Sequence, residues 1–211
     1  MPSWATHFRI ADRLLGSLNS IDTEYFIIGN ISPDCGIPAG NGYDPPTPVT
    51  HFTPKDIFMK SDCDYNFIYE QYIKNENDIK KKSFFTGYYV HLFTDCRNAV
   101  FCYKAYGSFL NNPALSAAVR KEWQNLDFEY FKNNVSPSFE LFKTYKGFSE
   151  NYPEWYKNNE IAKQMKNIVR YYSKGKPVKM NYAYSSQEER SRFVEKTAEE
   201  LETNLKELQL I

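Results

Sequence analysis

Apolar residues recur at helical spacing along most of this chain. Between residues 3 and 18 they form one stripe, made of Trp4, Phe8, Ala11, Leu14, Leu15 and Leu18, and an i, i+3, i+4 rhythm of this kind is typical of a helix with one buried face. The same rhythm predicts further helices over residues 78–109, 114–134, 138–145, 161–172 and 187–208. Shorter apolar clusters predict helices at residues 25–28 and 67–73. No segment alternates apolar and polar residues over a strand's length, so the sequence predicts an all-α fold.

The helix predicted over residues 78–109 is apolar nearly all round its middle, which indicates a buried helix at the centre of the fold. His91 and Asp95 lie in that middle, four residues apart and therefore on one face. Taken alone, this spacing favours a core histidine hydrogen-bonded to its neighbouring aspartate. Because buried charges are usually paired or bound to a metal, the pair also fits two ligands of one ion.

Residues 35–54 are rich in proline and glycine and predict a loop. A loop this long in a compact domain is usually functional or disordered. Asp34 precedes it, and His51 lies close to its far end. Both side chains bound to one metal would keep the loop ordered.

Composition narrows the class of protein. The chain has 211 residues, enough for one domain with a sizeable core, and 26 basic residues balance 26 acidic ones. This balance gives no strong signal for nucleic-acid binding. We find no secretory signal and no apolar run that is long enough to span a membrane, and we expect a single compact multi-helix domain over residues 1–211 in the cytoplasm.

The cysteines fit that compartment. No two of the four cysteines have the C-x-x-C spacing, which predicts reduced thiols; they are Cys35, Cys63, Cys96 and Cys102. Cys35 and Cys96 each follow a candidate aspartate, so they are expected to support the site by packing or, as the less favoured alternative, to act as soft ligands.

The chain contains 3 histidines, and each has a setting that suits a metal ligand. They are His7 beside the stripe of the first helix, His51 and His91; Asp34 and Asp95 have comparable settings. Zinc takes nitrogen and oxygen ligands, and a catalytic zinc keeps one position open for water. A structural zinc has four ligands and is closed, so five candidates fit an open site better.

The order of these motifs resembles the zinc-dependent phospholipase C family, whose architecture the single-strand-cleaving zinc nucleases share. The matching pieces are ATHFRIADRLL with His7, FIIGNISPDCG with Asp34, VTHF with His51, and GYYVHLFTD with His91 and Asp95. They cover about the first half of the chain, residues 1–110, and residues 111–211 are expected to complete the helical body.

The resemblance implies that Asp34, His51, His91 and Asp95 hold one zinc ion, and that His7 reaches a second ion which Asp95 bridges to the first. It also implies that Asp34 is a general base. The expected function is hydrolysis of a phosphoric ester by a zinc-bound hydroxide, with a phosphate-ester small molecule or a phospholipid head group as partner. The family's secreted members use an amino-terminal Trp and further histidines as ligands. Here the chain begins MPSW and has no histidine after His91, which implies one or two ions.

Two expectations concern other surfaces and another class of function. Phe52 and Tyr88 are candidates to line the substrate's side of the site, although core packing is the simpler interpretation for both. The last helix carries a narrow apolar seam at Val194, Ala198, Leu201, Leu205 and Leu208. Packing onto the body is the first interpretation of this seam, and a homodimer is the second. If the last helix docks a partner, the chain would be a non-catalytic helical interaction protein with a structural or vestigial metal site.

Overall fold

A computed structural model describes residues 2–40, 42–53, 62–107, 112–145, 147–150, 152–157 and 159–211. The predicted all-α fold is confirmed. The longer helices are α1 (Trp4–Leu14), α2 (Thr23–Ile31), α5 (Ile79–Tyr106), α6 (Pro113–Asn133), α7 (Pro137–Thr144), α8 (Glu160–Lys174) and α9 (Gln187–Glu207). The shorter ones are α3 (Thr47–Thr50) and α4 (Tyr65–Ile68), which a π-helical turn continues over Tyr69–Ile73.

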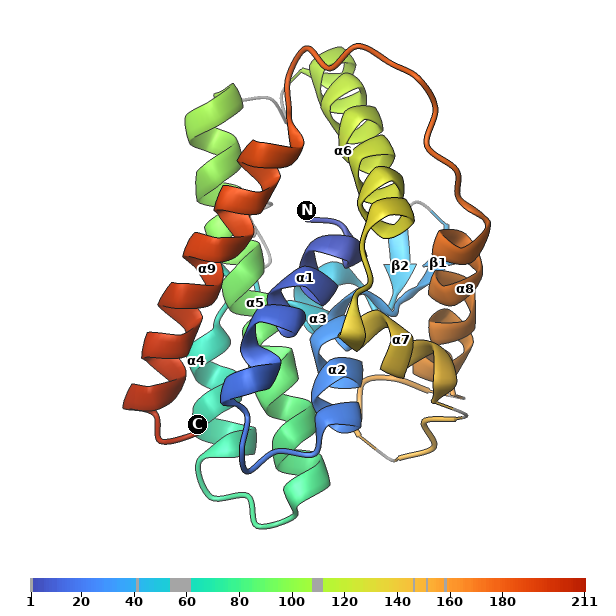
Figure 1. Cartoon of the computed structure of the whole chain (residues 1–211). Helices are drawn as coiled ribbons and strands as arrows, with labels where there is room; N and C mark the ends of the chain where they lie inside the picture. Colours follow the sequence, from blue (N-terminus) through green and yellow to red (C-terminus); the bar gives the residue numbers. More distant parts are fainter. Residues whose placement is uncertain are drawn as a thin grey trace.

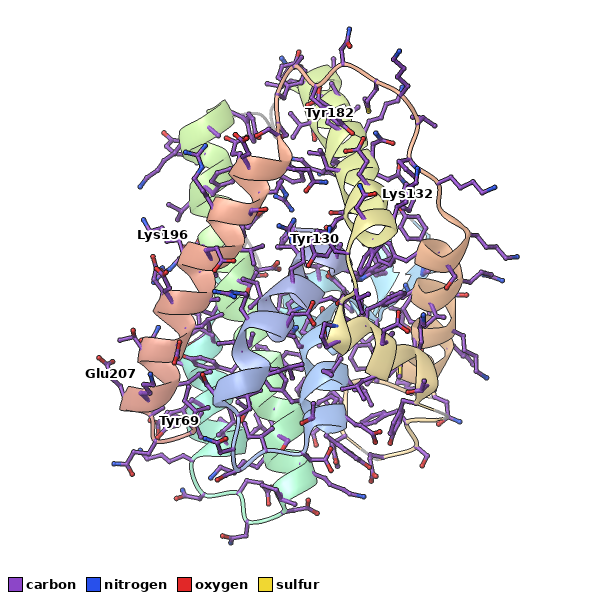
Figure 2. The ribbon with its side chains drawn as sticks, viewed as in Figure 1. Tyr69, Tyr130, Lys132, Tyr182, Lys196 and Glu207 are labelled. Carbon is purple, nitrogen blue, oxygen red and sulfur yellow. The ribbon has the colours of Figure 1, made fainter. Side chains whose placement is uncertain are left out.

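Helix α5 runs through the body, and the other helices pack around it. In Figure 1, α1 passes in front of α5, α2 lies beside the lower half of α5, α9 lies along α1, and α6 and α8 stand on the side of the small hairpin. Helix α2 packs on α5, and α9 packs on both α1 and α5. The middle of α5 is buried from Ser83 to Cys96, as its sequence predicted. Charged side chains such as Lys196 and Glu207 lie on the outer face of α9 (Figure 2).

Side-chain caps fix where several of these helices begin. In each case a side-chain oxygen of the N-cap residue accepts a hydrogen bond from a backbone N–H of the first turn, and these caps are Ser3, Asp22, Asp78, Asn112, Ser136 and Ser186. Such a bond satisfies a donor that has no partner within the helix. Pro113 and Pro137 occupy the first turns that follow two of the caps, where a missing N–H costs nothing.

Two glycines allow α2 and α5 to approach each other closely. A Cβ atom at Gly29 would lie 1.8 Å from the carbonyl oxygen of Phe84, and one at Gly87 would lie 2.0 Å from the carbonyl oxygen of Phe26. Each helix therefore places a glycine against the backbone of the other. No larger residue fits at either position without moving a helix.

The predicted loop 35–54 is more structured than expected. Strands β1 (Ile37–Ala39) and β2 (Gly42–Asp44) form an antiparallel hairpin that pairs Ile37 with Asp44, and α3 follows it. The hairpin is too short for the alternation that identifies a strand from sequence. Position 54 lies outside the described residues, as do positions 108 and 109, where we predicted the end of the central helix.

The apolar seam of α9 faces the body. Val194, Ala198, Leu201 and Leu205 are all buried, and they belong to the main core. The seam therefore packs onto the body, as the first interpretation predicted, and a homodimer through α9 stays a prediction. Among the described residues, no helix has the length and apolar character that crossing a membrane requires.

The glycine contact predicts a large loss of stability in Gly87→Ala. The added methyl group meets backbone atoms, which cannot rotate away, so we expect the free energy of unfolding to fall by about 3 kcal/mol. Gly16→Ala is the matched control, because none of the described residues has an atom within 4 Å of a Cβ atom there. Urea unfolding of both variants measures the difference. Equal stabilities of the two variants would contradict the close packing of α2 on α5.

Candidate metal centre

Four separate segments bring the five predicted ligands together. His7 comes from α1, Asp34 from the end of a 3-10 turn over Ser32–Asp34, His51 from the residue directly after α3, and His91 with Asp95 from α5. The three histidines and Asp95 are at most 2% exposed, and the side chain of Asp34 is 8% exposed. The structure thus brings together all five residues that the sequence singled out.

Local contacts hold the two ligands at the ends of the loop. Pro33 lies inside the 3-10 turn that ends at Asp34 and restricts its backbone. The hydroxyl group of Tyr88 donates to the carbonyl oxygen of Thr50. This bond ties α3, and with it the neighbouring His51, to the central helix.

The distances between the donor atoms suit a shared metal ion. His51 Nε2 lies 3.3 Å from Asp95 Oδ2, 3.4 Å from Asp34 Oδ1 and 3.4 Å from His91 Nε2. Two donors bound to one tetrahedral zinc ion at about 2.0–2.1 Å lie about 3.4 Å apart. The spacing of these nitrogen and oxygen atoms therefore fits zinc.

The two oxygens of Asp95 face different histidines. Oδ1 lies 3.6 Å from His7 Nε2, whereas Oδ2 lies 3.3 Å from His51 Nε2 and 3.7 Å from His91 Nε2. Donor atoms of His7, His91 and Asp95 lie within 4.8 Å of one another, and so do those of Asp34, His51 and His91. A carboxylate between two groups of imidazoles has the arrangement that a bridging ligand requires.

Hydrogen bonds at Nδ1 fix the ring orientation of two of the histidines, His91 and His51. His91 Nδ1 lies 2.8 Å from the carbonyl oxygen of Asn30, which can only accept, so Nδ1 carries the proton. His51 Nδ1 lies 2.8 Å from the hydroxyl oxygen of Thr50, and this hydroxyl group donates to the carbonyl oxygen of Thr47. With a metal bound at His51 Nε2, Nδ1 would carry the proton and donate it to the Thr50 hydroxyl oxygen. Both rings turn Nε2 towards the centre, as metal-binding histidines do.

Asn30 supports a third histidine through its side chain. Its Nδ2 donates to the carbonyl oxygen of His7 at 2.8 Å. In addition, the rings of His7 and His91 stack at a centroid distance of 3.8 Å with an angle of 4° between their planes. One fully buried residue on α2 thus aligns the helices that carry His7 and His91.

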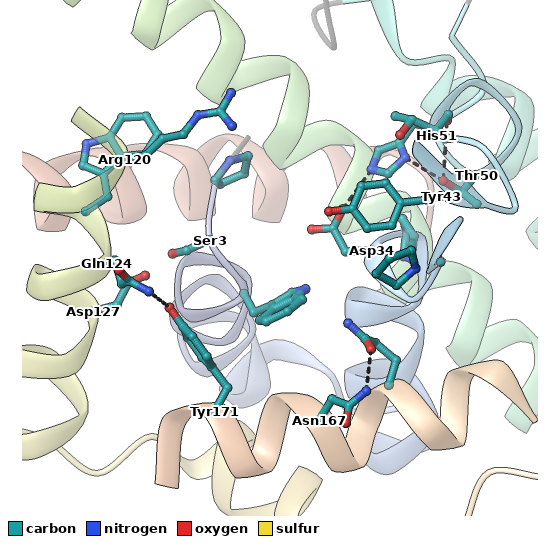
Figure 3. A pocket seen from close by; sticks show the side chains of 18 of the residues that line it. Ser3, Asp34, Tyr43, Thr50, His51, Arg120, Gln124, Asp127, Asn167 and Tyr171 are labelled. Atoms are coloured by element: carbon teal, nitrogen blue, oxygen red, sulfur yellow. Dashed lines mark hydrogen bonds and ion pairs between the residues drawn. The ribbon is translucent and has the colours of Figure 1, made fainter. Parts of the chain in front are cut away.

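A cleft of about 530 Å³ opens beside this centre. Asp34 and His51 line it, together with residues of the hairpin, the amino-terminal segment, α6 and α8. Figure 3 shows Asp34 and His51 on one side of the cleft, and Arg120, Gln124 and Asp127 on the other. The centre therefore meets a space large enough for a small-molecule ligand.

The other residues predicted near the site belong to the core. Tyr88 is fully buried and Phe52 packs on Phe67, Tyr88 and Trp155, so neither lines this cleft. The Cys35 thiol donates to the carbonyl oxygen of Ile31, and burial raises its pKa well above the ordinary value, which favours a protonated packing group. The Cys96 thiol donates to the carbonyl oxygen of Cys63, and hydrogen bonding to Cys63 lowers its pKa.

Sequence reasoning did not identify Asn30, Thr50 or the far side of the cleft. Asn30 lies beside the motif, but its role depends on where α1 and α5 pass. Thr50 directly precedes His51, and a hydroxyl group next to a candidate histidine is a signal that could have been used. The residues on α6 and α8 are distant in sequence and carry no recognisable motif.

The support of His51 by Thr50 predicts a weaker metal site in Thr50→Val. This change keeps the side-chain shape but removes the acceptor for His51 Nδ1, and loss of such a contact lowers metal affinity about 10-fold or more. Thr86→Val is the control, because the Thr86 hydroxyl group is buried as well but donates to the carbonyl oxygen of Lys82 within α5, away from the cluster. Competition with a zinc-binding dye measures both affinities. A Thr50→Val protein that binds zinc as the control does would refute this role.

Comparison with known proteins adds one finding. Residues 6–96 match a family model described as zinc dependent phospholipase C. No curated protein matches the chain, and no solved structure does either. The matched range contains all five residues of the metal centre and ends just after Asp95. Over residues 6–96 this match confirms the resemblance to the zinc-dependent phospholipase C family that the sequence predicted.

Proposed function

We propose that this chain is a metal-dependent phosphoric-ester hydrolase, a phospholipase C-like phosphodiesterase that uses one or two zinc ions. One observation carries the proposal. Three imidazoles and two carboxylates converge at distances that suit zinc, and two of these five side chains border a cleft. The match to a zinc-dependent phospholipase C family model supports it.

The number and placement of the ligands favour a catalytic site. A structural zinc is enclosed by four protein ligands, whereas a catalytic zinc keeps a position for water or substrate. Five donors exceed what one closed ion takes, and Asp34 and His51 place the edge of the cluster on the cleft. The non-catalytic alternative, a helical interaction protein with a structural or vestigial site, requires a closed cluster.

The five residues of the cluster would bind the ions in two groups. Asp34, His51, His91 and Asp95 would hold one ion, and His7 with the second oxygen of Asp95 would hold another. Zinc bound there would polarise the phosphoryl oxygens and lower the pKa of a bound water to about 7. The charges of the two carboxylates would partly balance those of the cations, which are costly to bury alone.

Asp34 is the candidate general base. It is the one carboxylate of the cluster that lines the cleft, so it can reach both a water at the cluster and a phosphate ester in the cleft. Its carboxylate would accept the proton of that water as the water attacks phosphorus and the bond from phosphorus to the alcohol oxygen breaks. The alcohol would leave with a proton from Asp34 or from solvent. Its contact with His51, at 3.4 Å, orients it for this task.

The size of the cleft favours a small phosphate ester or the head group of a phospholipid as substrate. A space of about 530 Å³ lies within the range of sites for drug-sized ligands. The balanced net charge of the chain gives no support for a long polyanion such as a nucleic acid.

Variants of the cluster test this function. We expect His91→Ala and Asp95→Ala to lose bound zinc, because each removes a central ligand. We expect Asp34→Asn to lower the hydrolysis of bis(p-nitrophenyl) phosphate by about 100-fold, the usual contribution of a general base. Elemental analysis and a phosphodiesterase assay provide the two measurements.

Asp44→Asn is the control for these variants, because Asp44 lies on β2 near the cleft but is exposed and outside the cluster. It should retain zinc and activity. Stoichiometric zinc in both alanine variants would rule out the proposed ligand set. Full activity in Asp34→Asn would rule out the base.

A further inference from the structure

One face of α6 forms the wall of the cleft opposite the metal centre. Arg120, Trp123, Gln124 and Asp127 all line the cleft. Their spacing of three, four and seven residues from Arg120 places them on one side of a helix. Figure 3 shows that Arg120, Gln124 and Asp127 come from this helix and lie across the cleft from Asp34.

A face of α8 continues this wall with further polar groups. Gln164, Asn167 and Tyr171 line the cleft. The Gln124 amide donates to the hydroxyl oxygen of Tyr171, which joins the two helices. The Asn167 amide donates to Gln164 Oε1 at 3.1 Å, as the lower part of Figure 3 also shows. We call seven residues of α6 and α8 the far wall: Arg120, Trp123, Gln124, Asp127, Gln164, Asn167 and Tyr171.

The far wall has one cation and one acid at separate positions. Arg120 is exposed, and the described part of the chain places no carboxylate within 4.0 Å of its guanidinium group. Asp127 is 5% exposed, and burial raises its pKa to about 6. Seven residues of helix separate them by about 10 Å. A ligand along this wall meets hydrogen-bonding groups in its middle and a positive charge at one end.

We propose that the far wall binds the alcohol part of a phosphate ester, and that this part is hydroxylated and carries a second anionic group. This inference rests on the proposed function, since the metal centre would hold the phosphate that is cleaved. The amides of the far wall and Asp127 would bind the hydroxyl groups, and Arg120 would pair with the second anion. A guanidinium group suits this pairing because it can donate two parallel hydrogen bonds to a phosphate or a carboxylate.

A quaternary ammonium group is the competing ligand. Trp4 and Tyr43 line the cleft, and aromatic rings bind such cations. Arg120 disfavours it, because like charges in a shared cleft repel. Helices α6 and α8 also lie outside residues 6–96, the range that matches the family model. The far wall is therefore not part of the matched segment.

Binding of small probes to the zinc-loaded chain tests the inference. The probes are inositol bisphosphate and adenosine bisphosphate, which have hydroxyl groups and a second phosphate, and phosphocholine, which has a cationic group. We expect each bisphosphate to bind about tenfold tighter than phosphocholine. We expect Arg120→Gln to raise the Kd of the bisphosphates about tenfold and to leave that of phosphocholine within about twofold.

Lys121→Gln is the matched control, because it removes the same charge from the neighbouring exposed position of α6, which does not line the cleft. The inference is overturned if both variants weaken the bisphosphates equally, or if phosphocholine binds as tightly as they do. Hydrolysis of bis(p-nitrophenyl) phosphate separates this failure from failure of the proposed function. If the chain hydrolyses the ester but Arg120→Gln binds the bisphosphates as the unchanged chain does, only the far wall is refuted. If the chain does not hydrolyse the ester but Arg120→Gln still weakens bisphosphate binding, only the hydrolase is refuted.

A final comparison separates the two sources of such a ligand. Vesicles that contain phosphatidylinositol phosphate present the group on a lipid, and inositol bisphosphate presents it in solution. Arg120-dependent binding of either one supports the far wall and identifies the source. Binding of neither one overturns the inference.

Discussion

The contact between α2 and α5 is the constraint on which the rest of this structure depends. Gly29 and Gly87 let the two backbones touch. Because the helices are so close, the carbonyl oxygen of Asn30 reaches His91 Nδ1. A wider separation would break this bond and misalign His91. The side chain of the same residue reaches the backbone of His7 on α1. Packing and chemistry are therefore linked at Asn30.

The metal centre also imposes an energetic condition on the fold. Asp95 is 1% exposed and lies in a helix whose neighbouring residues are mostly aromatic and aliphatic. Removing a carboxylate from water is costly unless it is paired with a charge or bound to a metal. Zinc binding would remove this cost, so the free energy of binding would add to the stability of the fold. The cluster would then serve both the stability of the core and the chemistry at the cleft.

The sequence predicted the parts of this arrangement that depend on local spacing. His91 and Asp95 share a helix face because they are four residues apart, and the helices predicted from residues 3 and 78 begin at Trp4 and Ile79. The local settings of His7, Asp34 and His51 made them candidate ligands, and the resemblance to a known family added how the five residues would share the ions. The far wall was not predicted, because Arg120 and Tyr171 meet at the cleft only through the packing of α6 and α8. Core packing was the simpler interpretation of Phe52 and Tyr88, and the structure confirms it.

X-ray absorption spectroscopy at the zinc edge tests the central claim most directly, because it reports which atoms bind the ion. Our account predicts nitrogen and oxygen neighbours at about 2.0–2.2 Å. It also predicts the outer-shell scattering of imidazole rings, with weaker imidazole scattering in His91→Ala protein to which zinc has been added. Cys35 and Cys96 directly follow two of the proposed ligands, so sulfur is the obvious rival donor. A sulfur neighbour at about 2.3 Å, or a spectrum without imidazole scattering, would contradict the account.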